Sequence, residues 1–451
     1  MRIGFLSTYP PNECGIATYT EALRAPLDHR RHETFVVAQQ GGAGRDVFGV
    51  YDPKQPFAEQ VFDVSTKLTP DLVHVQHEYG LFGQMHGVQF IDLLMRYRLV
   101  DLPTVVTLHT VYESLTRPQE LILGEIVEHA ARVIVHEPYQ KQTLREAFGD
   151  RYDIENKVAI IEHGIRECGP VHGAKERLGL AGRKVVMLCG YFRPTKGFHK
   201  IVQRLPELVE RDEDITLVLA GKLRGVEARE YRDKLLGMIE EAGVDEKHVK
   251  VFRGQFPQHT FDTVLSAADV MVLPYDVGAQ SGMMCQCFAM GAPVVASNLR
   301  AFQNAIDRTG GGLSVDDDDQ YVDAIVDLLH DEPRRRAMQA SVREYIRETA
   351  GWTRVAEQHE QVYRDALCED SQPGRYLFVP ECDEQAPVFA EDAAESSDDH
   401  AAAESFDDLD FTRQPAGESE RAGRLAKPGR DVSYAVRSGG GGAIGKMSPK
   451  Q

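Results

Sequence analysis

The sequence predicts an α/β protein with two Rossmann-like, doubly wound domains and a C-terminal tail that has no packed core. Apolar runs typical of buried strands alternate with amphipathic helical patterns as far as residue 368. Residues 168–182 interrupt this alternation with glycine, proline and charged residues, which indicates a link between two domains. Beyond residue 368 the apolar residues are sparse and unperiodic, so disorder is expected there.

Two domains and one closing helix follow from these patterns. The chain has 451 residues, more than one hydrophobic core usually holds. We expect an N-terminal domain over 1–168, a C-terminal domain over 183–350, a last helix over 351–368 and a disordered tail over 369–451. Trp352, the only tryptophan, suits either the junction between the domains or an ordinary core position. The charged blocks of the tail could bind a partner, but they are more typical of a solvated chain.

The composition restricts the partners and the compartment. The net charge is −19, so nucleic acid is not an expected partner, because phosphate binding needs a basic face. No apolar run reaches the length of a membrane span, and the N-terminus begins with a strand pattern rather than a signal peptide. The seven scattered cysteines suit a reducing compartment, and we expect a cytoplasmic protein. Cys285 and Cys287 lack a second pair at metal spacing, which favours helix packing over a metal site.

The N-terminal half alternates strand patterns with helical patterns. We expect strands over 1–7, 32–38, 71–77, 103–109, 131–137 and 157–165, and helices over 16–27, 81–100, 116–131 and 138–149. Such alternation is typical of an open parallel sheet that is covered on both faces. Gly15 lies between the first strand and the first helix, where it could let the backbone approach a ligand or could simply form a tight turn.

Four of these strands end in a histidine, namely His77, His109, His136 and His163. Ligands of open parallel sheets bind outside the carboxyl ends of the strands. One histidine at such an end is more often a hydrogen-bonded structural residue than a catalyst. Four of them at one edge favour a polar cleft, although the pattern does not say which of them does chemistry.

The C-terminal half repeats the alternation. We expect strands over 184–192, 215–223, 248–256, 269–275 and 292–297, and helices over 198–212, 226–243, 259–268, 282–290, 318–331 and 332–348. This pattern predicts a second Rossmann-like domain of similar size.

Residues 271–297 carry the pattern of a strand, a loop, a short helix and a strand. Ser281 is placed as a helix N-cap and Gly291 as a C-cap glycine. A helix that begins at Gly282 would offer free backbone N–H groups and the positive end of its dipole, which suits a phosphate. Without a ligand the same stretch is an ordinary crossover, and alone it favours neither interpretation.

The segment GYFRPTKG follows the first strand of the second domain. Its Arg193 offers a bidentate fork and its Lys196 a point charge, which together suit a diphosphate. Two solvated surface charges would be the default interpretation of an isolated R-x-x-K. Here the pair lies at the edge where ligands bind, together with the loop of residues 280–283.

Taken together, residues 1–368 resemble the retaining family-4 glycosyltransferases, also called glycosyltransferase group 1. The segments that carry the resemblance are PPNECGIATYT, VQHEYGLFG, TLHTV, EHGI, GYFRPTKG, VLAG, FRG, ADVMVLPY, SGMMCQCFAMGAPVVAS and GWTRVAEQHEQVY. The resemblance implies the GT-B fold, with an acceptor domain and a nucleotide-sugar donor domain that face a central cleft. It implies that the last helix returns towards the first domain. These motifs are specific for the superfamily and weak for the substrate.

The resemblance also implies a site. Arg193 and Lys196 would hold the diphosphate of a nucleotide sugar, and His109 would lie near the sugar and the β-phosphate as the third catalytic residue. Substrate-binding roles would fall to Gly15, His77, Glu78, Phe256, Gln280, Ser281, Gly282, Met283 and Gln286. In this set Gly15 lets the first loop close on the donor, Phe256 lies near the base, and the amides of 281–283 face the phosphates and the sugar.

The sequence departs from the family at two positions. The family usually carries two glutamates eight residues apart, and here Gly278 and Gln286 occupy those places. Gln286 could still hydrogen-bond ribose hydroxyls, but without charge assistance. Gly278 offers no side chain, so a sugar contact is lost unless Gln280 or a backbone group replaces it. In this respect the chain is similar to subgroups with a Q-S-G loop that lack the paired glutamates.

The mechanism implied by the resemblance is a retaining transfer of a hexosyl group to an acceptor hydroxyl by front-face displacement. Arg193, Lys196 and the helix end at Gly282 would stabilise the departing diphosphate. Glu78 is equally an acceptor contact or base and a structural hydrogen-bond partner. Neither a metal nor a cofactor is expected. The acceptor stays open between a glycan, a lipid-linked glycan and a small molecule, and a lipid-linked acceptor would allow peripheral membrane contact.

Two other interpretations stay open. One is another GT-B enzyme, such as a sugar-nucleotide epimerase or a phosphorylase. The other is a catalytically weak GT-B scaffold that binds a sugar nucleotide or a glycan and recruits partners through its tail. Gly278 and Gln286 favour the scaffold, whereas Arg193, Lys196 and His109 oppose it.

Overall fold

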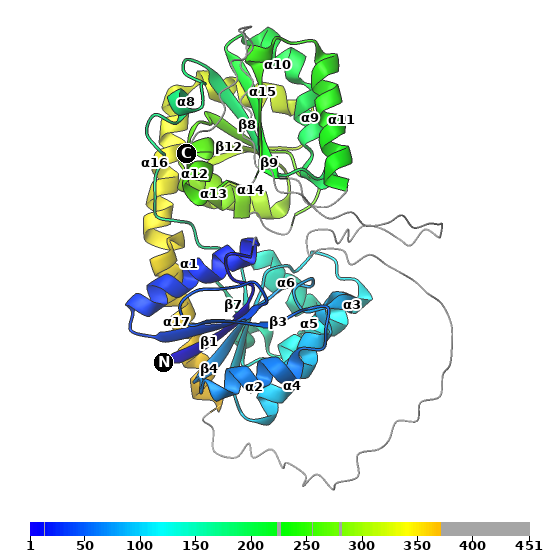
Figure 1. Cartoon of the computed structure of the whole chain (residues 1–451), viewed down its shortest axis with the longest axis vertical. Coiled ribbons are helices and arrows are strands. Elements are labelled where there is room, and N and C mark those ends of the chain that lie inside the picture. The colour runs from blue at the N-terminus through cyan, green and yellow to red at the C-terminus, as the bar shows by residue number, and fades with distance from the viewer. Residues whose placement is uncertain (13, 223–226, 255, 279–281, 371–451) are drawn as a thin grey trace, which may run out of the picture. The chain divides into compact units, whose positions relative to one another are not determined.

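A computed structural model describes residues 1–370 except residues 13, 223–226, 255 and 279–281 (Figure 1). It contains two parallel sheets, each with helices on both faces, which confirms the prediction of two Rossmann-like α/β domains. The last helix, α17 (Trp352–Asp370), extends two residues beyond its expected end. The remainder of the predicted disordered tail lies outside the described residues.

The first sheet has seven strands in the order β3-β2-β1-β4-β5-β6-β7. The strands are β1 (Arg2–Ser7), β2 (Glu33–Gln39), β3 (Val47–Tyr51), β4 (Leu72–His77), β5 (Thr104–Leu108), β6 (Arg132–Val135) and β7 (Val158–Ile160). The sequence patterns did not predict β3. It is an edge strand in which only Val50 and Tyr51 are buried, so it lacks the continuous apolar run of a central strand.

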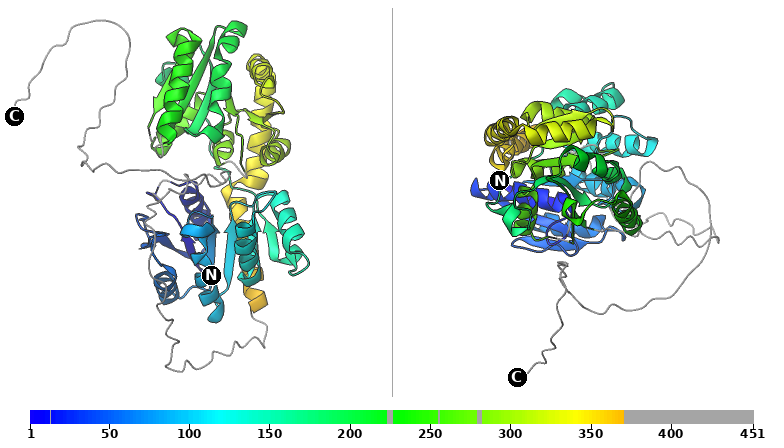
Figure 2. Two further views of the ribbon diagram at one scale, coloured as in Figure 1. Left: turned by 90° about the vertical axis from the view of Figure 1, so that its right-hand side faces the viewer. Right: turned by 90° about the horizontal axis from the view of Figure 1, so that it is seen from above.

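Helices cover both faces of this sheet, as Figure 2 shows. On one face lie α1 (Gly15–His29) and α17, whose Tyr19, Leu23 and Tyr363 pack with strand residues in one core. On the other face lie α2 (Ala58–Lys67), α4 (Gln89–Leu99), α5 (Arg117–His129), α6 (Pro138–Phe148) and the short α7 (Ile154–Lys157). The closing helix therefore completes the core of the N-terminal domain.

The helix expected over residues 81–100 is wrong in its first third. The long helix α4 begins only at Gln89, and the preceding turn α3 (Gln84–Gly87) contains left-handed residues, Met85 with φ 54° and His86 with φ 58°. The helical periodicity came from apolar residues such as Phe82 that are buried in the core from a loop. Burial from a loop and burial from a helix leave the same local pattern.

The second sheet has six strands in the order β10-β9-β8-β11-β12-β13. The strands are β8 (Lys184–Tyr191), β9 (Ile215–Lys222), β10 (Val249–Arg253), β11 (Val270–Leu273), β12 (Val294–Ser297) and β13 (Gly312–Val315). Its helices are α8 (Ala174–Arg177), α9 (Phe198–Gln203), α10 (Leu205–Arg211), α11 (Glu227–Ala242), α12 (Gln258–Ser266), α13 (Gly282–Ala289), α14 (Arg300–Thr309), α15 (Gln320–His330) and α16 (Glu332–Tyr345), with short turns η1 (Pro194–Lys196), η2 (Glu246–His248) and η3 (Ile346–Ala350).

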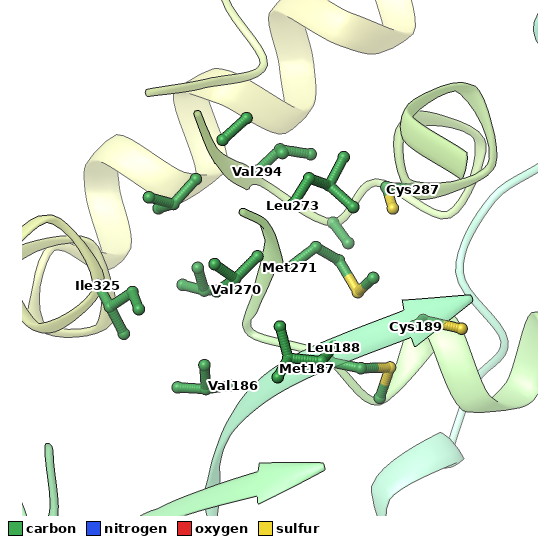
Figure 3. Packing of buried hydrophobic residues seen from close by; sticks show 14 of the residues in the cluster. Val186, Met187, Leu188, Cys189, Val270, Met271, Leu273, Cys287, Val294 and Ile325 are labelled. Atoms are coloured by element: carbon green, nitrogen blue, oxygen red, sulfur yellow. The ribbon is translucent and has the colours of Figure 1, made fainter. Parts of the chain in front are cut away.

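The core of this domain is built on neighbouring central strands. Figure 3 shows Met187 and Leu188 of β8 beside Met271 of β11, with Ile325 of α15 close by. The helix expected over 198–212 is split into α9 and α10, because Pro206 in the first turn of α10 has no N–H with which to continue a helix. The sequence patterns did not predict α14 and β13.

The strand orders place a topological switch point in each sheet. In the first sheet β1 lies between β2 and β4, and in the second β8 lies between β9 and β11. Chain connections leave the sheet on opposite sides at such a point, so a crevice forms outside the carboxyl ends of the two strands. The segment GYFRPTKG follows β8 and the predicted anion loop follows β11. Both motifs therefore flank one switch point.

The two crossings between the domains lie side by side. The outgoing strand is held to the returning one by a hydrogen bond from the Ile165 N–H to the Ala350 carbonyl, at 2.7 Å. The ring of Trp352 covers Gly164 so closely that a Cβ there would lie 2.4 Å from it. Trp352 therefore lies at the junction, and it also belongs to the hydrophobic core of the N-terminal domain, so both places that the sequence allowed are occupied by the one ring.

Candidate functional site

The loop after β8 is held in one conformation by Gly197. Its φ is +63°, a left-handed value that favours glycine, and a Cβ there would lie 1.8 Å from the carbonyl oxygen of Pro274. The turn η1 therefore packs directly against the end of β11. This contact brings Arg193 and Lys196 to the switch point of the second sheet.

Lys196 is a half-buried lysine whose ammonium group lies over an aromatic ring. Its Nζ lies 3.8 Å from the ring centroid of Tyr275, a cation–π contact. Burial and, to a smaller extent, the charge of Arg193 lower its pKa to about 8. In the described part of the chain no carboxylate pairs with it, whereas Lys200 nearby pairs with Asp276 at 2.7 Å. An anion at this place would relieve the cost of burying the ammonium group.

The start of α13 approaches the same place. A Cβ on Gly190, at the end of β8, would lie 3.9 Å from the Cε of Met283 and 4.0 Å from the hydroxyl of Tyr275. Gly282, the first residue of α13, is exposed with open space around its Cα. The predicted contacts of Gln280 and the N-cap role of Ser281 lie outside the described residues. Gly291 ends the helix with φ +68°, as expected of a C-cap glycine.

Gln286 takes part in a contact that the sequence did not reveal. Its Oε1 accepts two hydrogen bonds from Arg166, at 2.9 and 3.2 Å, and Arg166 also binds Asp262 in a bidentate pair. Arg166 lies in the crossing between the domains, so this cluster connects the crossing to α12 and α13. Two further positions of the predicted site, Phe256 after β10 and Gly278 after β11, are both half-buried.

On the first domain, Gly15 and Glu78 follow the two strands of the other switch point, β1 and β4. No side chain or backbone atom lies within 4 Å of a Cβ placed on Gly15, so the backbone is open to approach there. The carboxylate of Glu78 accepts hydrogen bonds from the Thr110 hydroxyl at 2.5 Å and from the Tyr79 N–H at 3.0 Å. Burial raises the pKa of Glu78 to about 7, although both bonds oppose the rise.

The expected polar cleft is found only in part, because His163 is half-buried and lines a small cavity, whereas His77, His109 and His136 are buried. His109, His136 and His163 form a cluster of tilted rings, with neighbouring ring centroids 5.0 and 5.8 Å apart. Tyr19 packs against all three rings, and His109 is only 7% exposed. Tyr19 belongs to α1. The sequence of the strands does not indicate that a helix from another part of the chain will cover their ends.

His77 lies apart from this cluster. Its ring is stacked on Phe82, with centroids 5.9 Å apart and an interplanar angle of 15°, and it also contacts Phe90. Burial lowers its pKa to about 3. Its Nε2 is buried and has no hydrogen-bond partner among the residues that the structure describes. His77 is therefore an uncharged member of the aromatic core beneath the loop 79–88.

A bridge between the domains was missed by sequence reasoning. Arg308 of α14 binds both oxygens of Glu137, at 2.8 and 3.0 Å, and lies 3.1 Å from an oxygen of Glu162. Tyr345 donates a hydrogen bond to the other oxygen of Glu162. These groups line a cavity of about 40 Å³ together with Cys285. The glutamates were visible at two strand ends, but nothing in the sequence indicated that Arg308 would meet them.

Other possible sites are few in the described chain. The one close group of carboxylates and histidine is Glu125, Glu128 and His129 on the outer helix α5, where His129 lies 3.3 Å from Glu125. It is distant in the fold from either switch point. Cys287 is fully buried and packs in the second core, as expected of its place on a helix. None of the helices with described residues is long and apolar enough to cross a membrane.

Solved structures with the same architecture are numerous. Anabaena HepE, solved in complex with UDP, aligns with a TM-score of 0.65 over 81% of this chain and 100% of its own, at 15% identity. Sucrose-phosphate synthase from Thermosynechococcus elongatus also gives 0.65, over 82% and 100%, at 18% identity. At such identities the similarity shows the fold alone. The fold class is therefore GT-B, as expected.

The family comparison adds the class of protein. Residues 183–331, the second Rossmann-like domain, match the model of the family described as Glycosyl transferases group 1. The match covers the domain that carries Arg193, Lys196 and α13. The phosphatidyl-myo-inositol mannosyltransferase of Mycolicibacterium smegmatis is 28% identical over 274 residues, which cover 58% of this chain and 64% of that relative's length. The D-inositol 3-phosphate glycosyltransferase of Corynebacterium aurimucosum is 25% identical, over 72% of this chain and 77% of its own.

Proposed function

We propose that the protein is a glycosyltransferase that moves a hexosyl group from a nucleotide-diphosphate sugar to an acceptor hydroxyl, with retention of the anomeric configuration. The single observation that carries the proposal is Lys196. A half-buried ammonium group over the ring of Tyr275, with a pKa lowered to about 8 by desolvation and no carboxylate partner in the described chain, would be stabilised by a bound diphosphate.

The geometry supports a different role for each switch point, with the donor held at the second sheet and the acceptor at the first. On the donor side, Arg193, Lys196 and the N-terminus of α13 stabilise the negative charge that develops as the bond between the sugar C1 and the phosphate oxygen breaks. On the acceptor side, Glu78 as a carboxylate accepts a hydrogen bond from the acceptor hydroxyl, since a carboxylate with two bonds still has lone pairs to offer. The new bond joins C1 to the acceptor oxygen, and the proton passes to the departing phosphate.

Retention follows from this arrangement if both oxygens approach the same face of the sugar. No step of the scheme needs a metal or a cofactor, and we propose that the reaction proceeds without them. Measurement of activity in the presence of EDTA tests this part, and complete loss of turnover would contradict it.

The names of the relatives suggest which acceptors to test. Two of them are named for transfer to phosphatidyl-myo-inositol and to D-inositol 3-phosphate, and both are cyclic polyols with a phosphate group. We propose a hydroxylated acceptor of this broad kind as the first class to assay, with simple sugars as the alternative class.

The decisive experiment is donor binding by calorimetry, first with UDP, GDP and ADP and then with their sugars. We expect one nucleoside diphosphate to bind, and Lys196→Ala to weaken its binding by about 100-fold, in line with a desolvated charge pair worth roughly 3 kcal/mol. Lys250→Ala is the matched control, because Lys250 is a half-buried lysine of the same domain that bonds the carbonyls of Leu178 and Gly179.

Measurement of turnover then distinguishes the enzyme interpretation from the scaffold interpretation. The anomeric configuration of the product, read from NMR coupling constants, tests retention. If a nucleotide sugar binds but no acceptor is glycosylated, the scaffold interpretation gains, because Gln286 has its oxygen occupied by Arg166 and Gly278 offers no side chain. If no nucleoside diphosphate binds, the proposal is wrong.

A further inference from the structure

A continuous chain of buried polar groups runs through the core of the N-terminal domain. It consists, in order, of the carbonyl of Ile161 and the side chains of His136, His109, Gln76, His74 and Tyr363. The five side chains are each 7% exposed or less. We call this set the polar relay. It connects four neighbouring strands, β4, β5, β6 and β7, to the closing helix α17.

The direction of the relay is fixed at one end. The Nδ1 of His136 lies 2.8 Å from the carbonyl oxygen of Ile161, and a carbonyl can only accept, so His136 carries its proton on Nδ1. In a neutral ring the other nitrogen, Nε2, is then an acceptor. That nitrogen faces the Nδ1 of His109 at 3.4 Å, so His109 must carry its own proton on Nδ1 and donate to His136.

The same logic continues to the other end. With its proton on Nδ1, His109 has an acceptor at Nε2, which lies 2.8 Å from the atom placed as Oε1 of Gln76. The two ends of a glutamine amide are assigned from hydrogen bonding alone, and here the NH₂ group must point to His109. Once the two ends of the Gln76 amide are exchanged, its oxygen takes the place 3.3 Å from the Nε2 of His74, which also lies 2.8 Å from the Thr107 hydroxyl, while Tyr363 donates to the Nδ1 of His74 at 2.8 Å. Every member of the relay is satisfied in this order.

The opposite order fails at one link. If the oxygen of Gln76 accepted from the Nε2 of His109, then the lone pairs of His109 and His136 would face each other at 3.4 Å. Only a proton on one of the rings could relieve that contact. The surroundings disfavour such a charge, because the rings are enclosed by Tyr19 and by each other. Burial accordingly lowers the pKa of His136 to about 3 and that of His109 well below its usual value.

We propose that His136 is a positioning residue that fixes His109 as the neutral Nδ1–H tautomer through the polar relay. The inference rests on the proposed function only for its catalytic consequence, namely that His109 meets the donor as an uncharged ring held in one orientation. Both of its nitrogens are occupied within the protein. The positive charge at the leaving group therefore comes entirely from Arg193, Lys196 and the end of α13, and His109 contributes the shape of the site.

The direct test is the tautomer itself, measured on the full-length protein labelled with ¹⁵N-histidine. Long-range ¹H–¹⁵N spectra distinguish Nδ1–H, Nε2–H and imidazolium forms, and variants of single histidines provide the assignment. We expect His109 and His136 to be neutral Nδ1–H tautomers that do not titrate between about pH 6 and pH 9. An Nε2–H or charged His109 in the wild-type protein would overturn the proposal, whether or not the variants below fold.

Two variants then test the role of His136. In His136→Phe the acceptor for the Nδ1 proton of His109 is gone, and we expect His109 to change to Nε2–H, bonded to the oxygen of a rotated Gln76. In His136→Gln the new amide can donate to Ile161 and accept from His109, so the original tautomer should return. A folded His136→Phe protein with an unchanged His109 tautomer would contradict the inference.

The kinetic constants provide a second measurement, which a change in global stability alone would not alter. We expect His136→Phe to lower kcat by about tenfold, as misorientation in a site commonly does, while the affinity for the nucleoside diphosphate stays within about twofold, and His136→Gln to recover most of kcat. If the tautomers are as expected but no donor binds, the proposed function fails and the relay stands. If a donor binds and His109 is Nε2–H, the relay fails and the proposed function stands.

Discussion

At the scale of single residues, burial displaces two pKa values towards neutrality from opposite sides. Glu78 loses solvation of its carboxylate, which raises its pKa to about 7. Lys196 loses solvation of its ammonium group beside Arg193, which lowers its pKa to about 8. The scheme proposed above needs Glu78 ionised and Lys196 protonated. Both conditions hold together only in a narrow interval between the two values.

We therefore predict a bell-shaped dependence of kcat/KM on pH, which reports the groups of the free enzyme. It should rise through about pH 7 as Glu78 loses its proton and fall above about pH 8 as Lys196 loses its own. In Glu78→Gln the acidic limb should disappear. In Lys196→Arg the basic limb should move to higher pH, since an arginine does not deprotonate in this range. An acidic limb that persists in Glu78→Gln would exclude Glu78 as its origin.

Above about pH 7.5, where the terminal phosphate of the ligand has already lost its second proton, the pH dependence of nucleoside diphosphate binding should follow Lys196. A bound diphosphate favours the protonated amine, so binding should take up a proton above about pH 8 and affinity should fall there. Calorimetry in buffers of different ionisation enthalpy measures the uptake. The same measurement on Glu78→Gln is the control and should be unchanged.

At the scale of elements, the loop after β8 depends on one glycine. Gly197 combines a left-handed φ with a carbonyl oxygen 1.8 Å from the place of a Cβ, whereas Gly182 has a similar φ of +75° with open space. We predict that Gly182→Ala costs about 1 kcal/mol of unfolding free energy, from backbone strain alone. Gly197→Ala should cost at least about 2 kcal/mol more, because the loop must move. Urea denaturation of both variants measures the difference, and equal costs would show that the contact with Pro274 is not limiting.

Several elements were predictable because their signal is local. Continuous apolar runs identified β1, β4, β5 and β8, and the pattern from a glycine to a short helix identified α13 and its C-cap at Gly291. Others were not predictable for the same reason. The edge strand β3 has only two buried residues, and the loop before α4 buries Phe82 without being a helix.

At the scale of the whole molecule, the bridge of Arg308 joins the two Rossmann-like domains. Glu137 is almost fully buried and Arg308 is about a quarter exposed, so the pair is stronger than a surface ion pair and weaker than a fully enclosed one. We predict a coupling energy of about 1–2 kcal/mol in a double-mutant cycle of Arg308→Gln and Glu137→Gln. The exposed pair Arg96–Asp92, at 3.1 Å, is the control and should couple by about 0.3–0.5 kcal/mol. Equal coupling in both cycles would mean that the bridge is a surface contact.

The junction itself should depend on Trp352. Its ring lies against Gly164 and packs edge-on to Tyr19. Removal of the ring in Trp352→Ala would leave a cavity where the two crossings meet, and we predict a loss of about 3–5 kcal/mol in unfolding free energy. Trp352→Phe should lose less, because part of the ring contact remains. A loss below about 1 kcal/mol in the alanine variant would show that the ring does not hold the crossings together.

The sequence by itself determined the fold class and the number of sheets, and it predicted two loops that would suit a diphosphate. These properties rest on apolar periodicity and on glycine positions, which act over a few residues. Only the tertiary structure decided that three strand-end histidines cluster around Tyr19, that Gln286 is held by Arg166 from 120 positions away, and that Arg308 bridges two glutamates of the other domain. Such contacts depend on which surfaces come together when helices and domains pack, and no local sequence pattern indicates which surfaces these will be.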